Sequence, residues 1–491
     1  MMRLMKTLTR RLTYLLLLSC VSLNVAQGVD IDKMNLPDMG DSSGTLLTPT
    51  EEKELGEAFF RSLHTEVDIS TDSEISDYIQ YIGEKLTASS DEPSRQFHFF
   101  VVMANDVNAF AGPGGYIGVN AGLILTTEAE SELASVMAHE IAHVTQRHLY
   151  RAYEAQKRMS IPTLAATLAA IALGSQNPAA GQAALMAISA GGLQFQIDFT
   201  RQNEQEADRV GMQTLVASQF DPHSMPTFFE RLQQASRYYG QAVPEFLRTH
   251  PVTASRIADT RGRADSYPYK QYPDSLSYQL VKAKLKVLNQ RHNLDEAARY
   301  FQTRLNQGIS EQRDVASYGM ALIALTQEKF TDAETLLQRL ARNAPHEAHY
   351  ASALARTALA AKNFSLAQSR YLQLVKLFPD NQAFKLDYIE ALLKMGNTEA
   401  AQQNLANLAP RTQQLPIYWE LLAQVYNTLK QPAESHRYLA EYYFSVGQVH
   451  DAVLQIKLAQ QSRGLNFVLA TLLAERLNFF LSQEMELRRG R

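Results

Sequence analysis

Cysteine is nearly absent from this chain of 491 residues, since Cys20 is the only one. It lies close to the N-terminus, so the rest of the sequence can form neither a disulfide nor a thiolate metal site. Any metal bound further along the chain would therefore need His and carboxylate ligands.

An excess of positive charge is also missing. There are 47 Lys and Arg residues against 51 Asp and Glu residues, which gives a formal net charge of -4, and no basic stripe is present. We therefore expect no nucleic-acid partner. A mean hydropathy of -0.24 argues against a polytopic membrane protein. The 45% of hydrophobic residues and 20% of charged residues are normal for a globular protein and exclude wholesale disorder.

Residues 1–26 have the pattern of a signal peptide. Four basic residues precede a short apolar run from Leu12 to Leu23, and Ala26 is a small residue suited to cleavage. Because the run is too short to span a bilayer comfortably, the pattern predicts removal and a periplasmic protein. An alternative stays open, since the sequence from Leu17 to Cys20 loosely resembles a lipobox that would anchor the protein through a lipidated Cys20.

Several local patterns predict where helices and strands begin. Thr48–Glu51 and Thr127–Glu130 both have the capping-box pattern, and each predicts the start of a helix. Phe97–Val102 and Tyr116–Asn120 are predicted strands, separated by a turn at residues 112–115. The second strand is interpreted either as an edge strand that receives an extended substrate or as an ordinary inner strand.

The C-terminal part is helical and repetitive. Ala333, Ala367 and Ala401 are spaced by 34 residues, and so are Pro345 and Pro379. This period, with small residues at fixed offsets, resembles tetratricopeptide repeats, which stack into a solenoid that holds extended segments or partner proteins.

The chemistry is predicted at His139-Glu140-Ile141-Ala142-His143. On a helix, His139 and His143 lie on one face, where both imidazoles can hold one Zn²⁺ ion. Glu140 can then take a proton from a water molecule whose pKa the zinc lowers to about 7. The pattern therefore predicts a hydrolytic zinc site.

A catalytic zinc site needs a third protein ligand and an open position. The candidates lie in the segment from Asn203 to Asp208. Glu204 and Asp208 share one helix face, so that Glu204 can bind the metal while Asp208 accepts a hydrogen bond from a ligand imidazole. Spacing alone does not separate Glu204 from Glu206.

These motifs resemble those of the gluzincin metallopeptidases related to HtpX and the CAAX prenyl proteases. The resemblance rests on the HEIAH helix, on Gln146-Arg147-His148 and on the block from Asn203 to Arg209. It implies that the first Glu of a Glu-x-x-Ala-Asp motif, Glu204, is the third ligand, and that Asp208 supports a ligand. The Asn108–Gly115 stretch is similar to the strand beside the cleft in that family, with Gly112-Pro113 as a departure.

The fold class expected is α+β and mainly helical, with a zincin-type metallopeptidase domain followed by an α-solenoid of tetratricopeptide repeats. The predicted parts are a signal peptide at 1–26, a flexible lead at 27–47, a peptidase domain at 48–272 and a repeat domain at 278–485.

The resemblance, taken with the signal peptide and the repeats, implies a periplasmic zinc metalloendopeptidase with one Zn²⁺ per chain. It implies that the enzyme degrades unfolded or stalled outer-membrane β-barrel proteins and assists their assembly at the barrel-assembly machinery. The alternative is an assembly adaptor or chaperone with a latent zinc site, acting mainly through the repeats.

Four further features have open interpretations. His250 is a candidate fourth zinc ligand that holds the enzyme latent, a candidate polariser of the substrate carbonyl, or a solvent-facing loop residue. Arg256 is a candidate to pair with an acidic residue or to bind an oxyanion, although a surface salt bridge is the first expectation. His148 is expected in a structural role. The uncharged segment 160–197 is predicted to be a helical hairpin that acts as a lid or contacts a membrane.

Overall fold

The computed structural model describes residues 47–153, 161–173, 201–239 and 244–489. The predicted signal peptide, Cys20 and all of the apolar hairpin beyond Leu173 lie outside the described residues. Residues 46–491 form one compact unit. Among the helices described, none combines the length and the apolar character needed to cross a membrane.

A three-stranded sheet lies at the centre of the N-terminal half. Its strands are β1 (His98–Val102), β2 (Ala109–Ala111) and β3 (Tyr116–Asn120), in the order β1-β3-β2. β1 runs parallel to β3, and β2 runs antiparallel to it. Both predicted strands are confirmed. The edge-strand interpretation of Tyr116–Asn120 is wrong, because β3 pairs on both sides, and β2 is an edge of the sheet as described.

The turn between β2 and β3 lies tightly against the first helix. Pro113–Gly115 form a short 3-10 helix in which Gly114 and Gly115 have φ of 68° and 77°. These left-handed conformations favour glycine. A Cβ atom at Gly114 would lie 3.0 Å from the Cα atom of Gly56, so the turn also needs a residue without a side chain to pack there.

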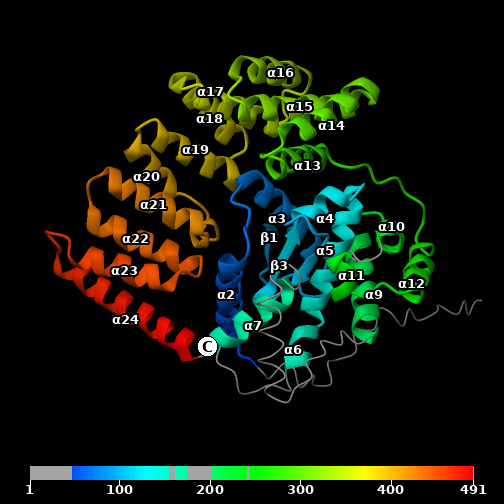
Figure 1. Cartoon of the computed structure of the whole chain (residues 1–491), viewed down its shortest axis with the longest axis horizontal. Helices are drawn as coiled ribbons and strands as arrows, with labels where there is room; N and C mark the ends of the chain where they lie inside the picture. The colour runs from blue at the N-terminus through cyan, green and yellow to red at the C-terminus, as the bar shows by residue number, and fades with distance from the viewer. Residues whose placement is uncertain (1–46, 154–160, 174–200, 240–243, 490–491) are drawn as a thin grey trace, which may run out of the picture. The chain divides into compact units, whose positions relative to one another are not determined.

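Helices surround this sheet (Figure 1). In chain order they are α2 (Pro49–Glu66), α3 (Ser73–Thr87), α4 (Ala121–Thr126), α5 (Glu130–Thr145), α6 (His148–Tyr153), α7 (Ile161–Leu173), α9 (Arg201–Ala217), α10 (Ser224–Tyr239), α11 (Glu245–Thr249) and α12 (Ala254–Ala264). Every residue of α5 is buried, so this helix lies in the core of the N-terminal half.

The two predicted capping boxes have different outcomes. Thr48 and Glu51 form the expected reciprocal box at the start of α2, so that prediction is confirmed. The box at Thr127–Glu130 is wrong, because Thr127 closes α4 and the N-cap of α5 is Ala129. The Glu130 carboxylate is occupied elsewhere, accepting hydrogen bonds from the Tyr78 hydroxyl at 2.8 Å and the Ser275 amide at 3.0 Å.

The C-terminal half consists of paired helices, coloured green to red in Figure 1. They are α13 (Leu276–Asn289), α14 (Leu294–Gln307), α15 (Ser310–Thr326), α16 (Phe330–Asn343), α17 (Ala348–Ala360), α18 (Phe364–Leu377), α19 (Gln382–Lys394), α20 (Thr398–Ala406), α21 (Pro416–Thr428), α22 (Pro432–Ser445), α23 (Val449–Gln460) and α24 (Phe467–Arg489). Ala333, Ala367 and Ala401 are fully buried at matching places in α16, α18 and α20. The helical repeat array is therefore confirmed.

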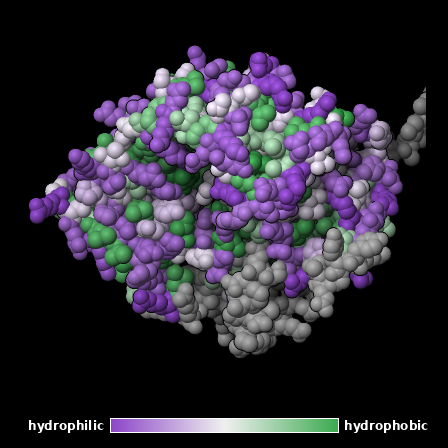
Figure 2. Space-filling model, turned by 45° about the horizontal axis from the view of Figure 1, so that its top comes forward, coloured by the Kyte–Doolittle hydropathy of each residue, from purple (hydrophilic) through white to green (hydrophobic). Residues whose placement is uncertain are grey.

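Hydrophilic residues cover most of the face shown in Figure 2, with smaller hydrophobic areas between them. The packing of the repeats against the N-terminal half includes one group of charges, of which Glu74 and Lys284 are buried. Asp72 and Glu74, at the start of α3, meet Lys284 of α13 and Arg356 of α17, and we call these four residues the α3 charge cluster.

Candidate active site

The site is built on α5. Its His139 and His143 are one helical turn apart, and their Nε2 atoms lie 3.0 Å from each other. Both side chains are buried, as are the apolar residues around them on the helix. The helical spacing alone accounts for the convergence of these two imidazoles.

Helix α9 brings the carboxylate. Gly211 lets α9 approach α5 closely, since a Cβ atom there would lie 3.0 Å from the backbone of Ala138 and His139. Glu204, two turns earlier on α9, then reaches the histidines. Its Oε2 lies 3.5 Å from His139 Nε2, and its Oε1 lies 3.4 Å from His143 Nε2.

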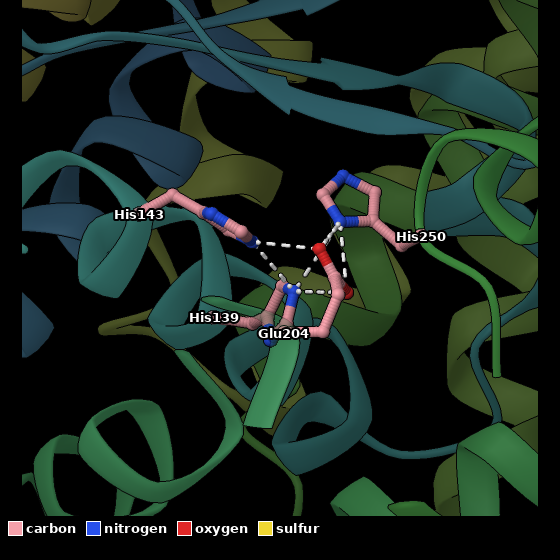
Figure 3. Close-up of side chains that lie close together, drawn as sticks. All are labelled: His139, His143, Glu204 and His250. Atoms are coloured by element: carbon pink, nitrogen blue, oxygen red, sulfur yellow. Dashed lines mark hydrogen bonds and ion pairs between the residues drawn. The ribbon is translucent and has the colours of Figure 1, made fainter. Parts of the chain in front are cut away.

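His250 completes the group from the segment after α11, as Figure 3 shows. Its Nδ1 lies 3.1 Å from Glu204 Oε1 and 3.4 Å from His139 Nε2, and its ring stacks on Phe246. Only 2% of the residue is exposed, so the solvent-facing interpretation of His250 is wrong. We call His139, His143, Glu204 and His250 the metal-site cluster, since their ligand atoms all lie within 4.8 Å of one another.

The spacing of these atoms fits a tetrahedral zinc ion. Zinc–nitrogen and zinc–oxygen bonds of about 2.0–2.2 Å place the ligands of a tetrahedral site about 3.3 Å apart. Three distances from ring nitrogens to Glu204 oxygens are 3.1 to 3.5 Å, two distances between ring nitrogens are 3.0 and 3.4 Å, and all four ligand atoms lie within 4.8 Å of one another. The arrangement therefore can hold a metal ion of this size.

Asp208 and Arg256 fix the first imidazole and the carboxylate. Asp208 Oδ1 lies 3.0 Å from His139 Nδ1, and Arg256 donates two hydrogen bonds to Asp208, at 2.7 and 2.8 Å. Arg256 also lies 2.7 Å from Glu204 Oε2. With 1% of its surface exposed, Arg256 is buried, so the expected surface salt bridge is wrong. Arg256 lies on α12, far along the chain from Glu204 and Asp208, and no sequence pattern links it to them.

His148 and Glu206 support the second imidazole. His148 Nδ1 lies 2.8 Å from His143 Nδ1, and its Nε2 lies 3.1 Å from Glu206 Oε2. If His148 donates to Glu206, its Nδ1 accepts from His143, which leaves His143 Nε2 as a bare lone pair. The expected structural role of His148 thus includes orienting a candidate ligand. Glu206 contacts His148 and so acts on His143 only through it.

The titration behaviour agrees with a cation site. Burial lowers the pKa of His143 well below its usual range, which keeps this imidazole neutral. Burial also acts to lower the pKa of His139, but Asp208 and Glu204 overcome that effect and raise it to about 9. The cluster therefore favours bound positive charge at the point that the ring nitrogens face.

Glu140 lies beside the cluster without joining it. Its carboxylate is buried and accepts no hydrogen bond from the described residues, and His250 Nε2 lies 3.5 Å from its Oε1. Burial raises the pKa of the Glu140 carboxyl above its usual range, although His250 and His139 act in the other direction. Such a carboxylate is available to exchange protons with a bound water molecule.

Comparison with known proteins gives consistent matches. The model of peptidase family M48 matches residues 74–264, and a tetratricopeptide-repeat model matches residues 358–425. A relative from Vibrio cholerae is 40% identical over 66% of each chain. The beta-barrel assembly-enhancing protease of Escherichia coli is 36% identical over 425 residues, which are 85% of each chain.

The chain belongs to the beta-barrel assembly-enhancing protease family. A more distant relative, the mitochondrial metalloendopeptidase OMA1 of Schizosaccharomyces pombe, is 28% identical over 37% of this chain and 50% of its own.

Membership in this family confirms the resemblance drawn from the motifs and makes the protein a metalloendopeptidase. The matched M48 region contains α5, α9 and α12, so it includes every side chain described above. The repeat match confirms the second half of the expected architecture.

Proposed function

We propose that the protein is a periplasmic zinc metalloendopeptidase that degrades misassembled outer-membrane β-barrel proteins and assists their assembly. The observation that carries the proposal is the convergence of His139, His143 and Glu204 on one point, with the Glu140 carboxylate beside it. The names of the bacterial relatives support the link to barrel assembly. The pattern of residues 1–26 supports export, by cleavage after Ala26 or by a lipid anchor on Cys20.

In this proposal the two halves divide the work. Residues 48–272 carry out hydrolysis, and the repeats at 278–485 hold unfolded or stalled barrel proteins or the barrel-assembly machinery. We infer that His139, His143 and Glu204 hold one Zn²⁺ ion, with Asp208 orienting His139. When bound, zinc supplies the Lewis acid that polarises the scissile carbonyl and makes water nucleophilic at neutral pH.

Glu140 is the proposed general base. It takes the proton of the attacking water and then gives it to the nitrogen of the leaving amine, so one carboxylate serves both halves of the hydrolysis. Its buried environment and its high pKa suit a group that must hold a proton between the two steps.

The substrate is proposed to lie along β2. This strand leaves an edge of the described sheet unpaired, and Ala111 lies next to Glu140 at the site. An extended peptide added to this edge would form backbone hydrogen bonds that do not depend on its sequence. Unfolded barrel proteins are rich in such segments, so a sequence-tolerant edge suits them as substrates.

His250 is proposed as a fourth ligand that holds the site latent. Its Nδ1 lies at distances from Glu204 Oε1 and His139 Nε2 that match a tetrahedral position. This observation also favours the second candidate function, an assembly adaptor or chaperone that acts through the repeats while its zinc site stays closed. His250→Ala would raise proteolysis if the residue closes the site and lower it if the residue polarises the substrate.

The experiment that tests the proposal is digestion of an unfolded outer-membrane β-barrel protein by the purified mature chain. Glu140→Gln is run beside it, and the zinc content of both is recorded. We expect cleavage by the wild type, cleavage slower by about 10²-fold or more in Glu140→Gln, and equal zinc in both. If neither cleaves while both hold zinc, the adaptor function is favoured. Zinc absent from the wild type would overturn the site itself.

A further inference from the structure

A cavity opens directly beside Glu140 and His143. Its volume is about 80 Å³, several times what one water molecule needs. Apart from these two residues, most of its lining is apolar and comes from five different elements; the main contributors are Phe59, Phe110, Val144, Tyr150, Leu168 and Ala172.

The walls of this cavity are held in place by packing. Phe59 and Phe110 meet edge to face, with ring centroids 6.4 Å apart, and both are at most 6% exposed. Gly114 donates a backbone hydrogen bond to the Tyr150 hydroxyl at 3.3 Å, which ties α6 to the turn after β2. Leu168 is also buried, on α7. The cavity is therefore a preformed feature and not a gap between loose side chains.

The position of Glu140 indicates which part of a substrate reaches the cavity. In the proposed hydrolysis, this carboxylate hands its proton to the nitrogen of the leaving amine. That nitrogen belongs to the residue that follows the cut bond, so the side chain of this residue starts within a few bonds of Glu140. The apolar cavity is the space next to that point.

We infer that this cavity binds the side chain of the substrate residue immediately after the cut bond, and that it selects large apolar side chains such as Phe, Tyr, Leu and Met. The inference rests on the proposed function and adds a sequence preference to it. Most of the wall is apolar and therefore rejects charged side chains. Glu140 and Arg147, which also line the cavity, have opposite charges, so neither sign of charge is favoured.

The size of the preference follows from apolar burial. Moving a side chain of this size from water into an apolar cavity favours cleavage at Phe over Ala by about 10- to 100-fold in kcat/KM. Backbone pairing along β2 adds no preference of its own, so the residue after the cut bond should dominate the specificity that β2 and the cavity provide.

The first measurement is the sequence of new N-termini that the wild type makes in an unfolded outer-membrane β-barrel protein, read by mass spectrometry. We expect Phe, Tyr, Leu and Met to be enriched several-fold and Gly, Asp and Glu to be depleted. Two peptides that differ only by Phe or Ala at this position then give the ratio of kcat/KM. Cleavage that depends on Glu140 but starts at residues without preference would overturn this inference and leave the proposed function intact.

A matched pair of variants on α7 tests the cavity itself. Ala172→Phe places a ring in the cavity, while Ala166→Phe places the same ring on the exposed face of the same helix. We expect Ala172→Phe to lose at least 10-fold on the Phe peptide and little on the Ala peptide, with zinc content unchanged, and Ala166→Phe to match the wild type. Ala172→Leu should act in the same direction by a smaller factor. Equal loss on both peptides would contradict the inference.

A measurement of peptide binding tests the inference even if the wild type cleaves no peptide. Zinc-loaded Glu140→Gln should bind a fluorescent Phe peptide about 10-fold more tightly than the Ala peptide, and Ala172→Phe in that background should remove the difference. Equal affinity for both peptides would overturn the cavity preference. Absence of cleavage by the wild type would instead count against the proposed function alone.

Discussion

The α3 charge cluster and the metal-site cluster are both buried and both contain carboxylates, yet their charges are balanced in opposite ways. In the first, Lys284 Nζ lies 2.9 Å from Glu74 Oε2, and Arg356 lies 3.3 Å from its other oxygen. Burial alone would raise the pKa of Glu74, but these two cations hold it far below its usual range. The cluster is complete with the side chains of the chain itself.

The metal-site cluster is complete only with a cation from outside. His139 Nδ1 faces Asp208 and His143 Nδ1 faces His148, so that the two Nε2 atoms face each other, 3.0 Å apart. Asp208 and Glu204 raise the pKa of His139 to about 9, so without a metal this imidazole holds a proton, whose place a metal ion would take. A charge cluster whose carboxylates are neutralised by the chain's own cations indicates a structural role. A cluster whose ligand atoms converge on one point indicates a binding site for a cation.

The largest effect expected is at the carboxylate of the metal-site cluster. Glu204→Gln removes the negative ligand, so we expect zinc affinity to fall by more than about 100-fold and proteolysis to be lost with it. In Glu206→Gln the amide oxygen still accepts a hydrogen bond from His148, so zinc affinity should fall by less than about 10-fold. Zinc content after competition with a chelator measures both. The reverse order would show that the third ligand is Glu206.

The second prediction concerns the α3 charge cluster, in which lysine and arginine neutralise the carboxylates. Lys284→Met leaves the Asp72 and Glu74 carboxylates with one cation fewer in a buried place, so the free energy of unfolding should fall by about 3–5 kcal/mol in urea at pH 7. Zinc content should not change.

Lys394→Met is the matched control, because Lys394 is exposed and 3.8 Å from Glu390 on the same helix, and its loss should cost less than about 1 kcal/mol. Equal costs for the two variants would show that the α3 charge cluster contributes no more than a surface pair.

Features that depend on neighbours along the chain could be predicted from the sequence. The spacing of His139 and His143 places them on one helix face in any surroundings, and the 34-residue period indicates stacked helix pairs before any packing is known. The capping box at Thr48 forms as expected, because the Glu51 carboxylate accepts hydrogen bonds from the amide and the hydroxyl of Thr48, three residues away.

Features that depend on residues distant in sequence could not be predicted. The box at Thr127 failed because Tyr78 and Ser275, far away along the chain, bind the Glu130 carboxylate. Arg256 carries no signal of burial, since its place is set by α12 packing near α9. The structural role predicted for His148 did not include its contact with His143, which depends on how α6 follows α5.

The smallest effect is expected at Asp77 of α3, which contacts the repeats through a neutral side chain. The Asp77 carboxylate accepts a hydrogen bond from Asn381 Nδ2 at 2.9 Å, and no Lys or Arg of the described residues forms an ion pair with it. Burial, with Glu84 and Glu74 nearby, raises the pKa of Asp77 to about 6 despite His349. The folded protein therefore binds the Asp77 proton more tightly than the unfolded chain does.

The sign of the pH dependence follows from that pKa. Below about pH 4 the carboxyl is protonated in both states, and its contribution to stability is lost as the pH rises through 6. Asp77→Asn, which is neutral throughout and keeps a hydrogen bond to Asn381, should therefore raise the free energy of unfolding by about 2–3 kcal/mol at pH 7 and by almost nothing at pH 3. A variant that is less stable than the wild type at pH 7 would show that the ionised carboxylate is paired after all, as in the α3 charge cluster.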